Sequence, residues 1–378
     1  MNCIFISTMT GVPWGGSEEL WSQTALYLAQ SGHQVGANVK AWPEIPSRIS
    51  ELEQAGVSLL QRNESPPTLA ARVFSKLTGK SAERKLTGAA AGWLRKQKPD
   101  LVCISMGNAR QGLPWLGLCR ELRLPHVIVV HGVYEVSWPM DTEGAEMEDY
   151  FLAAKQCYFV SQHNLKLFQD QIATRLPHAE VVRNPYNVSY ESELEWPATN
   201  DGWRLASVGR LEPPTKGQDI LLKVIGSEKW KQRALAISFY GGGEQYGECV
   251  RKLAQRYAPG QVEFFGHVDD VEEIWKFNHG LVMPSRCEGM PLALVEAMLC
   301  SRLPIVTDIG GHSELVTHGV NGFLAAGPTV ACIDAALEEA WQCRDAWQEM
   351  GGVAAISVRK KVPAHPAAEF ARQLEHLA

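Results

Sequence analysis

Short apolar runs alternate with segments of helical periodicity along most of the chain. The run Cys3–Ser7 predicts a buried strand, and a loop rich in glycine and proline follows it. Glu18–Gln30 then repeats apolar residues at helical spacing, and Val35–Lys40 predicts the next strand. Strand, glycine loop, helix and strand in this order open a parallel α/β unit.

The pattern recurs through both halves of the chain. Further strands are predicted at Leu101–Ser105, Val127–His131, Cys157–Ser161, Leu205–Gly209, Ala236–Tyr240, Val262–Phe265, Gly280–Met283 and Pro304–Thr307. Later helices are predicted at Ile220–Ile225, Val250–Tyr257, Leu292–Leu299 and Pro366–Leu377. The two series predict an α/β fold of two Rossmann-like domains that face each other across a cleft, which is a usual place for a ligand.

A change in composition marks the boundary between the two series. Asn184-Pro185 is a turn signal, and the stretch that follows, to about Asp201, is polar and lacks periodicity. We therefore predict domains at residues 1–190 and 191–362. A C-terminal helical segment, 363–378, is expected to pack back on the N-terminal domain.

Composition excludes several classes of protein. The 378 residues are 45% hydrophobic, which supports a large core and excludes general disorder. Lys and Arg number 36 against 42 Asp and Glu, and a net charge of −6 disfavours general nucleic-acid binding. Nine cysteines without a C-x-x-C pair disfavour a zinc ribbon and a disulfide framework and favour a reducing, cytoplasmic location. No apolar run reaches membrane-spanning length, and the first ten residues do not form a signal peptide.

Two carboxylates stand in the most informative stretch, around Glu288 and Glu296. Pro291 suits a first helical position, so Glu288 is expected on a loop and Glu296 inside an apolar, buried helix. A buried carboxylate needs hydrogen-bond donors, and two hydroxyls of a ribose would serve. Helix geometry separates the pair by roughly 12 Å, which exceeds the carboxylate spacing of about 5–9.5 Å in glycosidases. Alternatively, Glu288 is a loop charge and Glu296 a core residue satisfied by backbone donors.

Two cations follow the strand at Leu205–Gly209. Arg210 and Lys216 share the loop that runs from this strand toward the next helix. Fixed cations on such a loop form a clamp for a diphosphate, although a basic loop is also often only solvated.

Three further loops come at strand ends. Residues 239–243 (Phe-Tyr-Gly-Gly-Gly) bring backbone close to a flat or phosphorylated group, or form an ordinary tight turn. Residues 265–268 (Phe-Gly-His-Val) offer backbone groups to a base edge, and 307–315 end at a helix N-terminus, which suits an anion.

Together these motifs, over about Ser207–Leu324, resemble the C-terminal domain of the retaining glycosyltransferase family 4, which has the GT-B fold. The resemblance implies that this domain binds a nucleotide-sugar donor. It implies that Arg210 and Lys216 hold the diphosphate, Glu296 the ribose hydroxyls and Glu288 the hydroxyls of the donor sugar. The further donor-binding residues it implies are Gly209, Gly242, His267, Val268, Gly289, Met290, Pro291 and Leu292.

The N-terminal half resembles the family more loosely. Gly15 and Gly16, in Gly-Gly-Ser-Glu, match a loop beside the donor phosphates. His131 matches the active-site histidine that contacts the transferred sugar, whereas without the family it would be read as a core histidine. Ser161 and the segment Arg183-Asn184-Pro185 match a strand-closing serine and an interdomain turn.

Two positions depart from the family pattern. The loop from Arg210 to Lys216 is about one residue longer than usual, which puts the reach of Lys216 in question. Ser301 occupies a position where many members have glycine, so a strained helix cap with positive φ is expected there.

The resemblance implies a retaining transferase that moves a sugar from a nucleoside diphosphate to an acceptor hydroxyl, in polysaccharide or glycolipid synthesis. The N-terminal domain would bind a saccharide or lipid-linked acceptor, and His131, Arg210, Lys216 and Glu288 would be catalytic. No metal or other cofactor is expected, since no Asp-x-Asp motif is present. The alternatives are an epimerase or phosphorylase of the same fold, or a non-catalytic sugar-nucleotide-binding partner of a polysaccharide assembly complex.

A basic segment lies at residues 72–98. It carries eight cations and one acid, Glu83, with interleaved apolar residues such as Trp93 and Leu94. This pattern suggests peripheral contact with an anionic membrane at its inner face, and a solvated helical face is the alternative.

Overall fold

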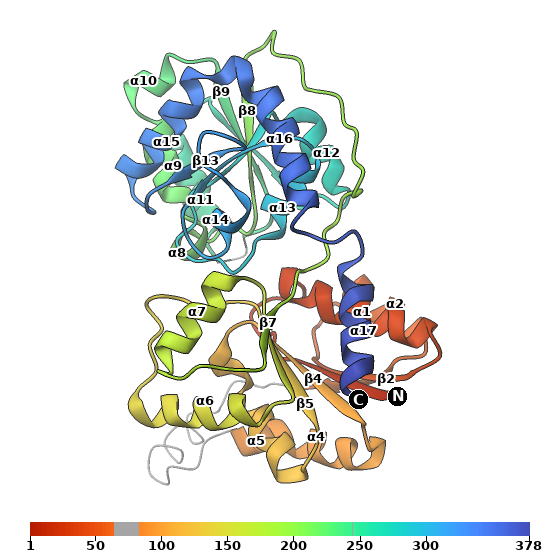
Figure 1. Cartoon of the computed structure of the whole chain (residues 1–378). Helices are drawn as coiled ribbons and strands as arrows, with labels where there is room; N and C mark the ends of the chain where they lie inside the picture. Colours follow the sequence, from red (N-terminus) through yellow and green to blue (C-terminus); the bar gives the residue numbers. More distant parts are fainter. Residues whose placement is uncertain (64–82, 244) are drawn as a thin grey trace. The chain divides into compact units, whose positions relative to one another are not determined.

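The computed structural model describes residues 1–63, 83–243 and 245–378, and the chain divides into two compact units (Figure 1). Unit 1 combines Met1–Pro185 with His365–Ala378, and unit 2 is Tyr186–Ala364. Unit 2 is therefore continuous in sequence, whereas unit 1 is completed by the last residues of the chain.

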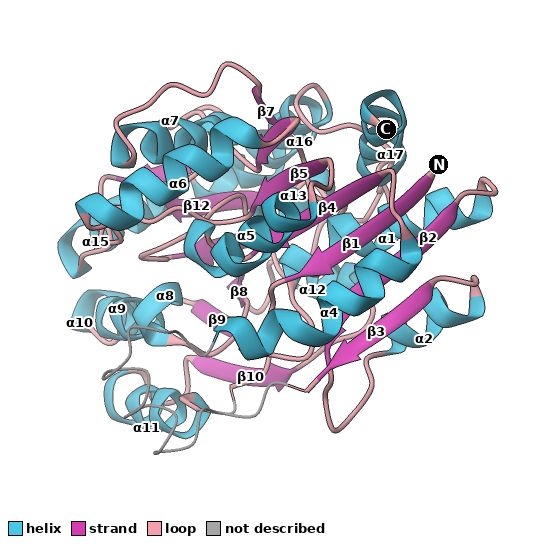
Figure 2. Cartoon of the chain, turned by 90° about the horizontal axis from the view of Figure 1, so that it is seen from below, coloured by secondary structure: helices cyan, strands magenta, loops and turns pink. Residues whose placement is uncertain are grey.

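Unit 1 is built on a parallel sheet with strand order β3-β2-β1-β4-β5-β6-β7. Its strands are β1 (Asn2–Ser7), β2 (Gln34–Lys40), β3 (Ser58–Arg62), β4 (Leu101–Met106), β5 (His126–Val130), β6 (Gln156–Phe159) and β7 (Ala179–Val181). Figure 2 shows the strands β3, β2, β1, β4 and β5 side by side in this order. Cys3 in β1 is in register with Val35 and Leu101 on either side.

Helices cover both faces of this sheet. They are α1 (Gly16–Gln30), α2 (Ser47–Gln54), α4 (Glu83–Gln97), α5 (Leu113–Leu122), α6 (Asp141–Ala153), α7 (Gln162–Gln171) and α17 (Pro366–Leu377), with a 3₁₀ turn, η1 (Ala109–Gly112). One core forms between the sheet and α4–α7, and a second forms against α1, α2 and α17. Central strands buried on both faces explain why the sequence shows continuous apolar runs rather than alternation.

The last helix, α17, completes the second core of unit 1 and lies beside α1 in Figure 1. The Thr24 hydroxyl of α1 donates a hydrogen bond to the carbonyl oxygen of Ala367 at 3.3 Å. Phe370 is fully buried, with its ring edge-on to Tyr158 at a centroid distance of 5.0 Å. The end of the chain is thus part of the hydrophobic core of unit 1.

Unit 2 repeats the architecture with strand order β10-β9-β8-β11-β12-β13, again parallel. Its strands are β8 (Trp203–Val208), β9 (Leu235–Tyr240), β10 (Val262–Gly266), β11 (Gly280–Met283), β12 (Leu303–Thr307) and β13 (Phe323–Ala325). Its helices are α8 (Pro213–Lys216), α9 (Gln218–Ile225), α10 (Glu228–Lys231), α11 (Gly247–Tyr257), α12 (Val271–Phe277), α13 (Leu292–Leu299), α14 (His312–Leu315), α15 (Val330–Gln342) and α16 (Trp347–Arg359), with a 3₁₀ turn, η2 (Arg344–Ala346).

Strand order reverses once in each sheet, between β1 and β4 in unit 1 and between β8 and β11 in unit 2. In open parallel sheets, ligands bind outside the carboxyl ends of the strands at this reversal. The loops that follow β8 and β11 contain Arg210 and Glu288, so the predicted donor residues lie at the reversal of unit 2.

The structure tests three local predictions. Pro291 is not the first helical residue of α13 but its N-cap, because its ψ of 133° is extended; that assignment was wrong by one residue. Ser301 has the predicted positive φ, at 57°. All nine cysteines are free thiols.

Candidate active site

The centre of the candidate site is an ion pair between the loops at the strand reversal of unit 2. Lys216, the last residue of α8, donates from Nζ to Glu288 Oε1 at 2.7 Å. The Ser285 hydroxyl donates to the same oxygen at 2.8 Å. The lysine side chain is 21% exposed and the carboxylate 7%, so both charges are largely withdrawn from water.

Backbone and side-chain contacts hold these two loops together. Arg286 N donates to Thr215 O at 2.7 Å, which ties the Glu288 loop to α8. The Arg286 guanidinium also binds both carboxylate oxygens of Asp219, at 2.7 and 2.9 Å. Burial alone would raise the pKa of Asp219, but the hydrogen bonds and charge of Arg286 lower it below its usual value. Sequence reasoning missed Arg286 and Asp219 because they lie 67 positions apart.

Glycine allows α8 to end close to the other loop. Gly217 has φ +68°, and a Cβ there would lie 2.1 Å from Pro284 O. A larger residue would push the Lys216 turn away from the Glu288 loop. Lys216 ends the short helix α8, and its side chain reaches Glu288.

Arg210 lies on the loop after β8 and is half exposed. Its Nη2 lies 2.9 Å from Glu212 Oε2, and its carbonyl oxygen accepts from Gln218 Nε2. The backbone of Arg210 is therefore fixed, while its guanidinium reaches solvent and has a carboxylate partner on the same loop.

Glu296 is buried in α13 as predicted, at 3% exposure. Its Oε1 accepts two hydrogen bonds from Asn187, one from the backbone N at 3.0 Å and one from Nδ2 at 3.1 Å. The protein itself therefore offsets part of the cost of burying this carboxylate. No local pattern could have identified Asn187, which is 109 residues away in the sequence.

A third loop, after β12, packs on the Glu288 segment. Gly311 N donates to Gly289 O at 2.7 Å, and Gly310, with φ +52°, approaches Glu288 O closely. His312 follows and is fully buried, with Nδ1 2.6 Å from Thr307 O. Burial lowers the pKa of His312, although the negative charge of Glu288 raises it in part. The electrostatics of this loop and of Glu288 are thus linked.

The remaining predicted donor residues differ in exposure. Met290 and Pro291 are buried beside Glu288, whereas Gly209, Gly289, Val268 and Leu292 are intermediate and Gly242 is exposed. The His267 side chain is 82% exposed and lies 3.5 Å from Asp269. All of them follow the carboxyl ends of strands, apart from Leu292, which opens α13.

In unit 1, His131 directly follows β5. Its Nε2 lies 3.1 Å from the Ser105 hydroxyl, and its backbone N donates to Met106 O at 2.9 Å. Burial lowers the pKa of His131 to about 4, so the imidazole is neutral at ordinary pH. Nδ1 is buried and has no partner among the described residues. Ser105 was not among the predicted site residues.

The glycine loop after β1 is anchored by Glu18. Gly15 is the N-cap of α1 and Gly16 its first residue. Glu18 Oε2 accepts from the Ser7 hydroxyl at 2.7 Å and from Trp21 Nε1 at 3.0 Å. Burial raises the pKa of Glu18 to about 7, against the effect of these donors.

Two other family-matched positions have structural contacts. Ser161 caps α7 by accepting from Asn164 N at 3.1 Å. Arg183 Nη1 donates to Val160 O at 2.9 Å, which ties the residues before the unit boundary to the end of β6.

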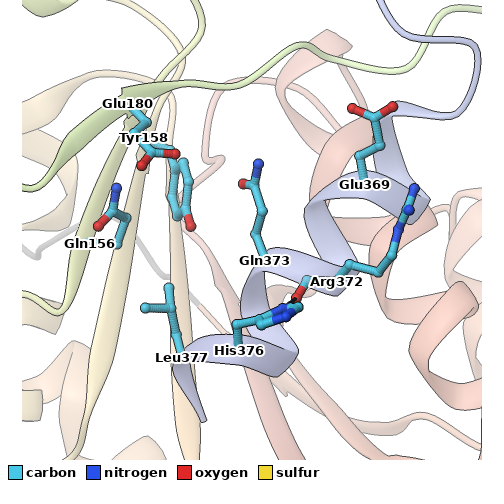
Figure 3. Close-up of a pocket in the computed structure, with 8 residues that line it drawn as sticks. All are labelled: Gln156, Tyr158, Glu180, Glu369, Arg372, Gln373, His376 and Leu377. Carbon is cyan, nitrogen blue, oxygen red and sulfur yellow. Dashed lines mark hydrogen bonds between the residues drawn. The ribbon is translucent and has the colours of Figure 1, made fainter.

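A groove of about 500 Å³ lies elsewhere in unit 1, between the strands and α17 (Figure 3). Gln156, Tyr158 and Glu180 line its strand side, and Arg372 and His376 are among the residues lining it from α17. It contains none of the predicted site residues.

Part of the basic segment 72–98 lies outside the described residues, including Arg72, Lys76 and Lys80. In the part that is described, Leu94 is buried in the core of unit 1 and Trp93 packs against it. These two apolar side chains therefore do not form an outward face.

Residues 1–63, 83–243 and 245–378 contain neither a membrane-spanning helix nor a metal-binding cluster. No helix there is long and apolar enough to cross a membrane. No group of three or more His, Cys, Asp or Glu side chains is placed to hold a metal ion within the same residues.

Comparison with known proteins shows a family similarity in the second unit. Residues 203–342 match the family model described as Glycosyl transferases group 1. The match lies wholly within unit 2. The matched segment contains the loops of Arg210, Lys216, Glu288 and Glu296.

Curated relatives of this domain are glycosyltransferases. An uncharacterized glycosyltransferase of Methanocaldococcus jannaschii is 27% identical over 218 residues, covering 57% of this chain and 58% of the relative. A glycogen synthase of Pseudomonas fluorescens is 25% identical over 357 residues, covering 84% of this chain and 71% of the relative. The chain thus spans little more than half of the archaeal relative.

Solved structures match both units together. The Anabaena protein Alr3699/HepE in complex with UDP-glucose has a TM-score of 0.75 at 17% identity, with all of both chains covered. Sucrose-phosphate synthase from Thermosynechococcus elongatus has a TM-score of 0.76 at 17% identity, also with full coverage. At this identity the likeness establishes the fold, and it confirms two Rossmann-like units of the GT-B type.

Proposed function

We propose that this chain is a metal-independent, retaining glycosyltransferase that moves a sugar from a nucleoside diphosphate to an acceptor hydroxyl in polysaccharide or glycolipid synthesis. The observation that carries the proposal is the Lys216–Glu288 pair at the strand reversal of the unit that matches the Glycosyl transferases group 1 model. This pair offers one cation and one carboxylate side by side, which matches a ligand with both phosphate and hydroxyl groups.

Donor binding would exchange the partners of this pair. A phosphate oxygen replaces Glu288 as the acceptor for Lys216, and hydroxyls of the donor sugar replace Lys216 as donors to Glu288. Because the pair is largely buried, neither charge can be left alone without a large penalty. A ligand that supplies both replacements at once is therefore favoured over a simple anion.

The chemical step places negative charge on the leaving diphosphate. The bond between the anomeric carbon and the phosphate oxygen breaks, and a bond to the acceptor oxygen forms on the same face of the sugar. A phosphate oxygen takes the acceptor proton, so charge and atoms balance. Lys216 and the half-exposed Arg210 stabilise the growing charge, and such preorganised stabilisation is usually the largest part of catalysis.

His131 has a hydrogen-bonding role in this proposal. A pKa of about 4 makes its imidazole too weak a base to take the acceptor proton at neutral pH. The neutral ring can still donate or accept a hydrogen bond to a hydroxyl of the transferred sugar. Ser105, at 3.1 Å from Nε2, fixes the ring orientation.

The relatives support a nucleotide-sugar donor. The matching Anabaena structures are described in complex with UDP and with UDP-glucose, and glycogen synthases are among the curated relatives. We therefore expect a nucleoside diphosphate sugar as donor for this chain.

The test begins with a thermal-shift screen of nucleoside diphosphates and their sugars. A ligand at 100 times its Kd stabilises the folded state by about 2.7 kcal/mol, so the true donor raises the Tm. Incubation with that donor and an acceptor panel should yield free nucleoside diphosphate and a glycoside whose anomeric configuration, read by proton NMR, equals that of the donor. An inverted product, an isomerised donor, a sugar phosphate, or binding without turnover would each contradict the proposal.

A further inference from the structure

Asn187 lies among the first residues of unit 2 and is a hydrogen-bond partner of the buried carboxylate of Glu296. Its backbone N, at 3.0 Å, and its side-chain Nδ2, at 3.1 Å, both donate to Oε1 of Glu296. Two donors from one residue on one oxygen fix the place of that oxygen and limit rotation of the carboxylate about its last side-chain bond. Asn187 therefore also sets the direction in which Oε2 points.

The segment that carries Asn187 is itself held on two helices. Ser189 N donates to Glu272 Oε1 of α12 at 2.7 Å. The Tyr190 hydroxyl donates to Arg359 O of α16 at 2.8 Å, and Arg359 Nε donates to Tyr190 O at 2.8 Å. These contacts order the donors of Asn187 independently of any ligand. A ligand of Glu296 therefore meets a carboxylate that is already oriented, which lowers the entropic cost of binding.

The residue type at position 187 bears on the charge of Glu296. Asn187 is exposed, whereas Glu296 is 3% exposed, so a neutral surface residue supplies donors to a buried carboxylate. An amide donor favours the charged form of the carboxylate. A second carboxylate in the same place would disfavour it, because like charges about 3 Å apart resist ionising together. The amide of Asn187 therefore suits a carboxylate that accepts hydroxyl hydrogens as an anion.

The place of Glu296 in the chain fits one end of a long ligand. It lies within α13, whereas Glu288 lies on the loop before α13 and is paired with Lys216. In a nucleoside diphosphate sugar, the transferred sugar and the ribose stand at opposite ends of the diphosphate. Because we propose Glu288 for the sugar and Lys216 for the diphosphate, the hydroxyls that fall to Glu296 are those of the ribose, and they would offset the cost of its burial.

We propose that Asn187 is a positioning residue for the donor. It orients Glu296 to receive the 2′- and 3′-hydroxyls of the ribose, and so sets the preference of the site for ribonucleotides over deoxyribonucleotides. The inference rests on the proposed function, because it takes a nucleoside diphosphate as the ligand. It adds a residue that acts through Glu296 rather than by touching the donor.

The test is calorimetric titration of the full chain with UDP, GDP, ADP and CDP and with their 2′-deoxy counterparts, at pH 5.5 and pH 8.5. For the nucleotide that binds most tightly, the wild-type protein should prefer the ribose form at least about tenfold at both pH values, since hydrogen bonds to charged groups are the strong ones. In Asn187→Ala this ratio should fall to about three at both pH values, because the Nδ2 donor is lost and the backbone donor remains.

Asn187→Asp separates positioning from a general loss of structure. At pH 5.5 one of the two coupled carboxyls keeps its proton and donates to the other, as the amide does, so the ratio should stay within about twofold of the wild type. At pH 8.5 both carboxyls ionise and repel each other, and the ratio should fall to about two. Asn200→Asp is the matched control, since Asn200 is an exposed residue of the same unit before β8, and it should keep the wild-type ratio at both pH values.

Equal affinity of the wild type for the two forms of the nucleotide would overturn the inference, and so would a ratio that both Asn187 variants leave unchanged. A fall of the same size at pH 5.5 and pH 8.5 in Asn187→Asp, or an equal fall in Asn200→Asp, would indicate a structural or general charge effect and would also overturn it. If the wild type binds none of these nucleotides, the proposed function fails, and the inference fails with it.

Discussion

Lys216 and Glu288 depend on each other for their charge balance. Removing one partner of a largely buried pair leaves the other charge without its counter-ion, which costs more than the pair contributes. The same arrangement makes the pair responsive to a ligand that supplies substitutes for both partners. Substitution of either residue should therefore impair the function of the site.

Lys216→Ala should reduce kcat/KM for transfer by about 10²-fold or more, because the developing phosphate charge loses its buried cation. The measurement is release of nucleoside diphosphate in the presence of acceptor. Lys252→Ala is the control, since Lys252 is exposed on α11 and pairs only with Glu248 among the contacts described. Near-normal turnover by a folded Lys216→Ala protein would show that Lys216 does not hold the diphosphate.

Glu18→Gln should stabilise the protein in a pH-dependent way. The folded pKa is raised to about 7 from 4.5, so between these values the unfolded state loses its proton while the folded state keeps it. Wild-type stability therefore falls as pH rises through this window. Because the variant lacks this titrating group, its free energy of unfolding should exceed that of the wild type by up to about 3 kcal/mol at pH 8 and by little at pH 4.5.

Urea unfolding at pH 4.5 and pH 8 measures this difference. Glu53→Gln, at an exposed position of α2, is the control and should have the same small effect at both pH values. If Glu18→Gln changes the free energy of unfolding equally at both pH values, burial does not hold the Glu18 carboxyl protonated.

Ser301→Gly should raise the free energy of unfolding by about 0.5–1 kcal/mol. A left-handed backbone costs a non-glycine residue about 1–2 kcal/mol, and the extra freedom of glycine in the unfolded chain cancels part of that gain. Ser357→Gly, inside the helix α16, should instead lose about 0.5 kcal/mol. Chemical denaturation measures both variants. If Ser301→Gly also lowered the free energy of unfolding, as Ser357→Gly should, the backbone at Ser301 would not be strained.

At the scale of elements, α17 shows how the far end of the chain stabilises the first unit. Phe370→Ala should lower the free energy of unfolding by about 3–5 kcal/mol, because it empties a fully buried site against Tyr158. Urea unfolding followed by tryptophan fluorescence measures the loss. Arg372→Ala, on the exposed side of the same helix, should stay within about 0.5 kcal/mol of wild type, and a comparable loss there would count against core burial as the cause.

At the scale of the whole molecule, only unit 2 is continuous in sequence. Residues 186–364 expressed alone should fold and show a Tm increase with the same nucleotides as the full chain. Residues 1–185 lack α17 and should unfold or aggregate, because the core that Phe370 fills is open. Circular dichroism and thermal shift test both fragments. An unfolded 186–364 fragment beside a folded full chain would contradict the independence of unit 2.

Local sequence patterns predict most of the central strands and helices. Gly280–Met283, Leu292–Leu299 and Pro366–Leu377 were predicted with the bounds that the structure has. The edge strands β7 and β13 were missed because three residues are too few to show a period. The strand β3 was missed because its residues Ser58, Gln61 and Arg62 interrupt the apolar run.

Local sequence determined most of the central strands and helices, where glycine loops follow strands, and that Glu296 is buried, since each depends on residues a few positions apart. Only the tertiary structure decided the pairs Lys216–Glu288, Asn187–Glu296 and Ser105–His131. These depend on the order in which strands pair in a sheet. That order brings together side chains that are from 26 to 109 residues apart, and no local periodicity specifies it.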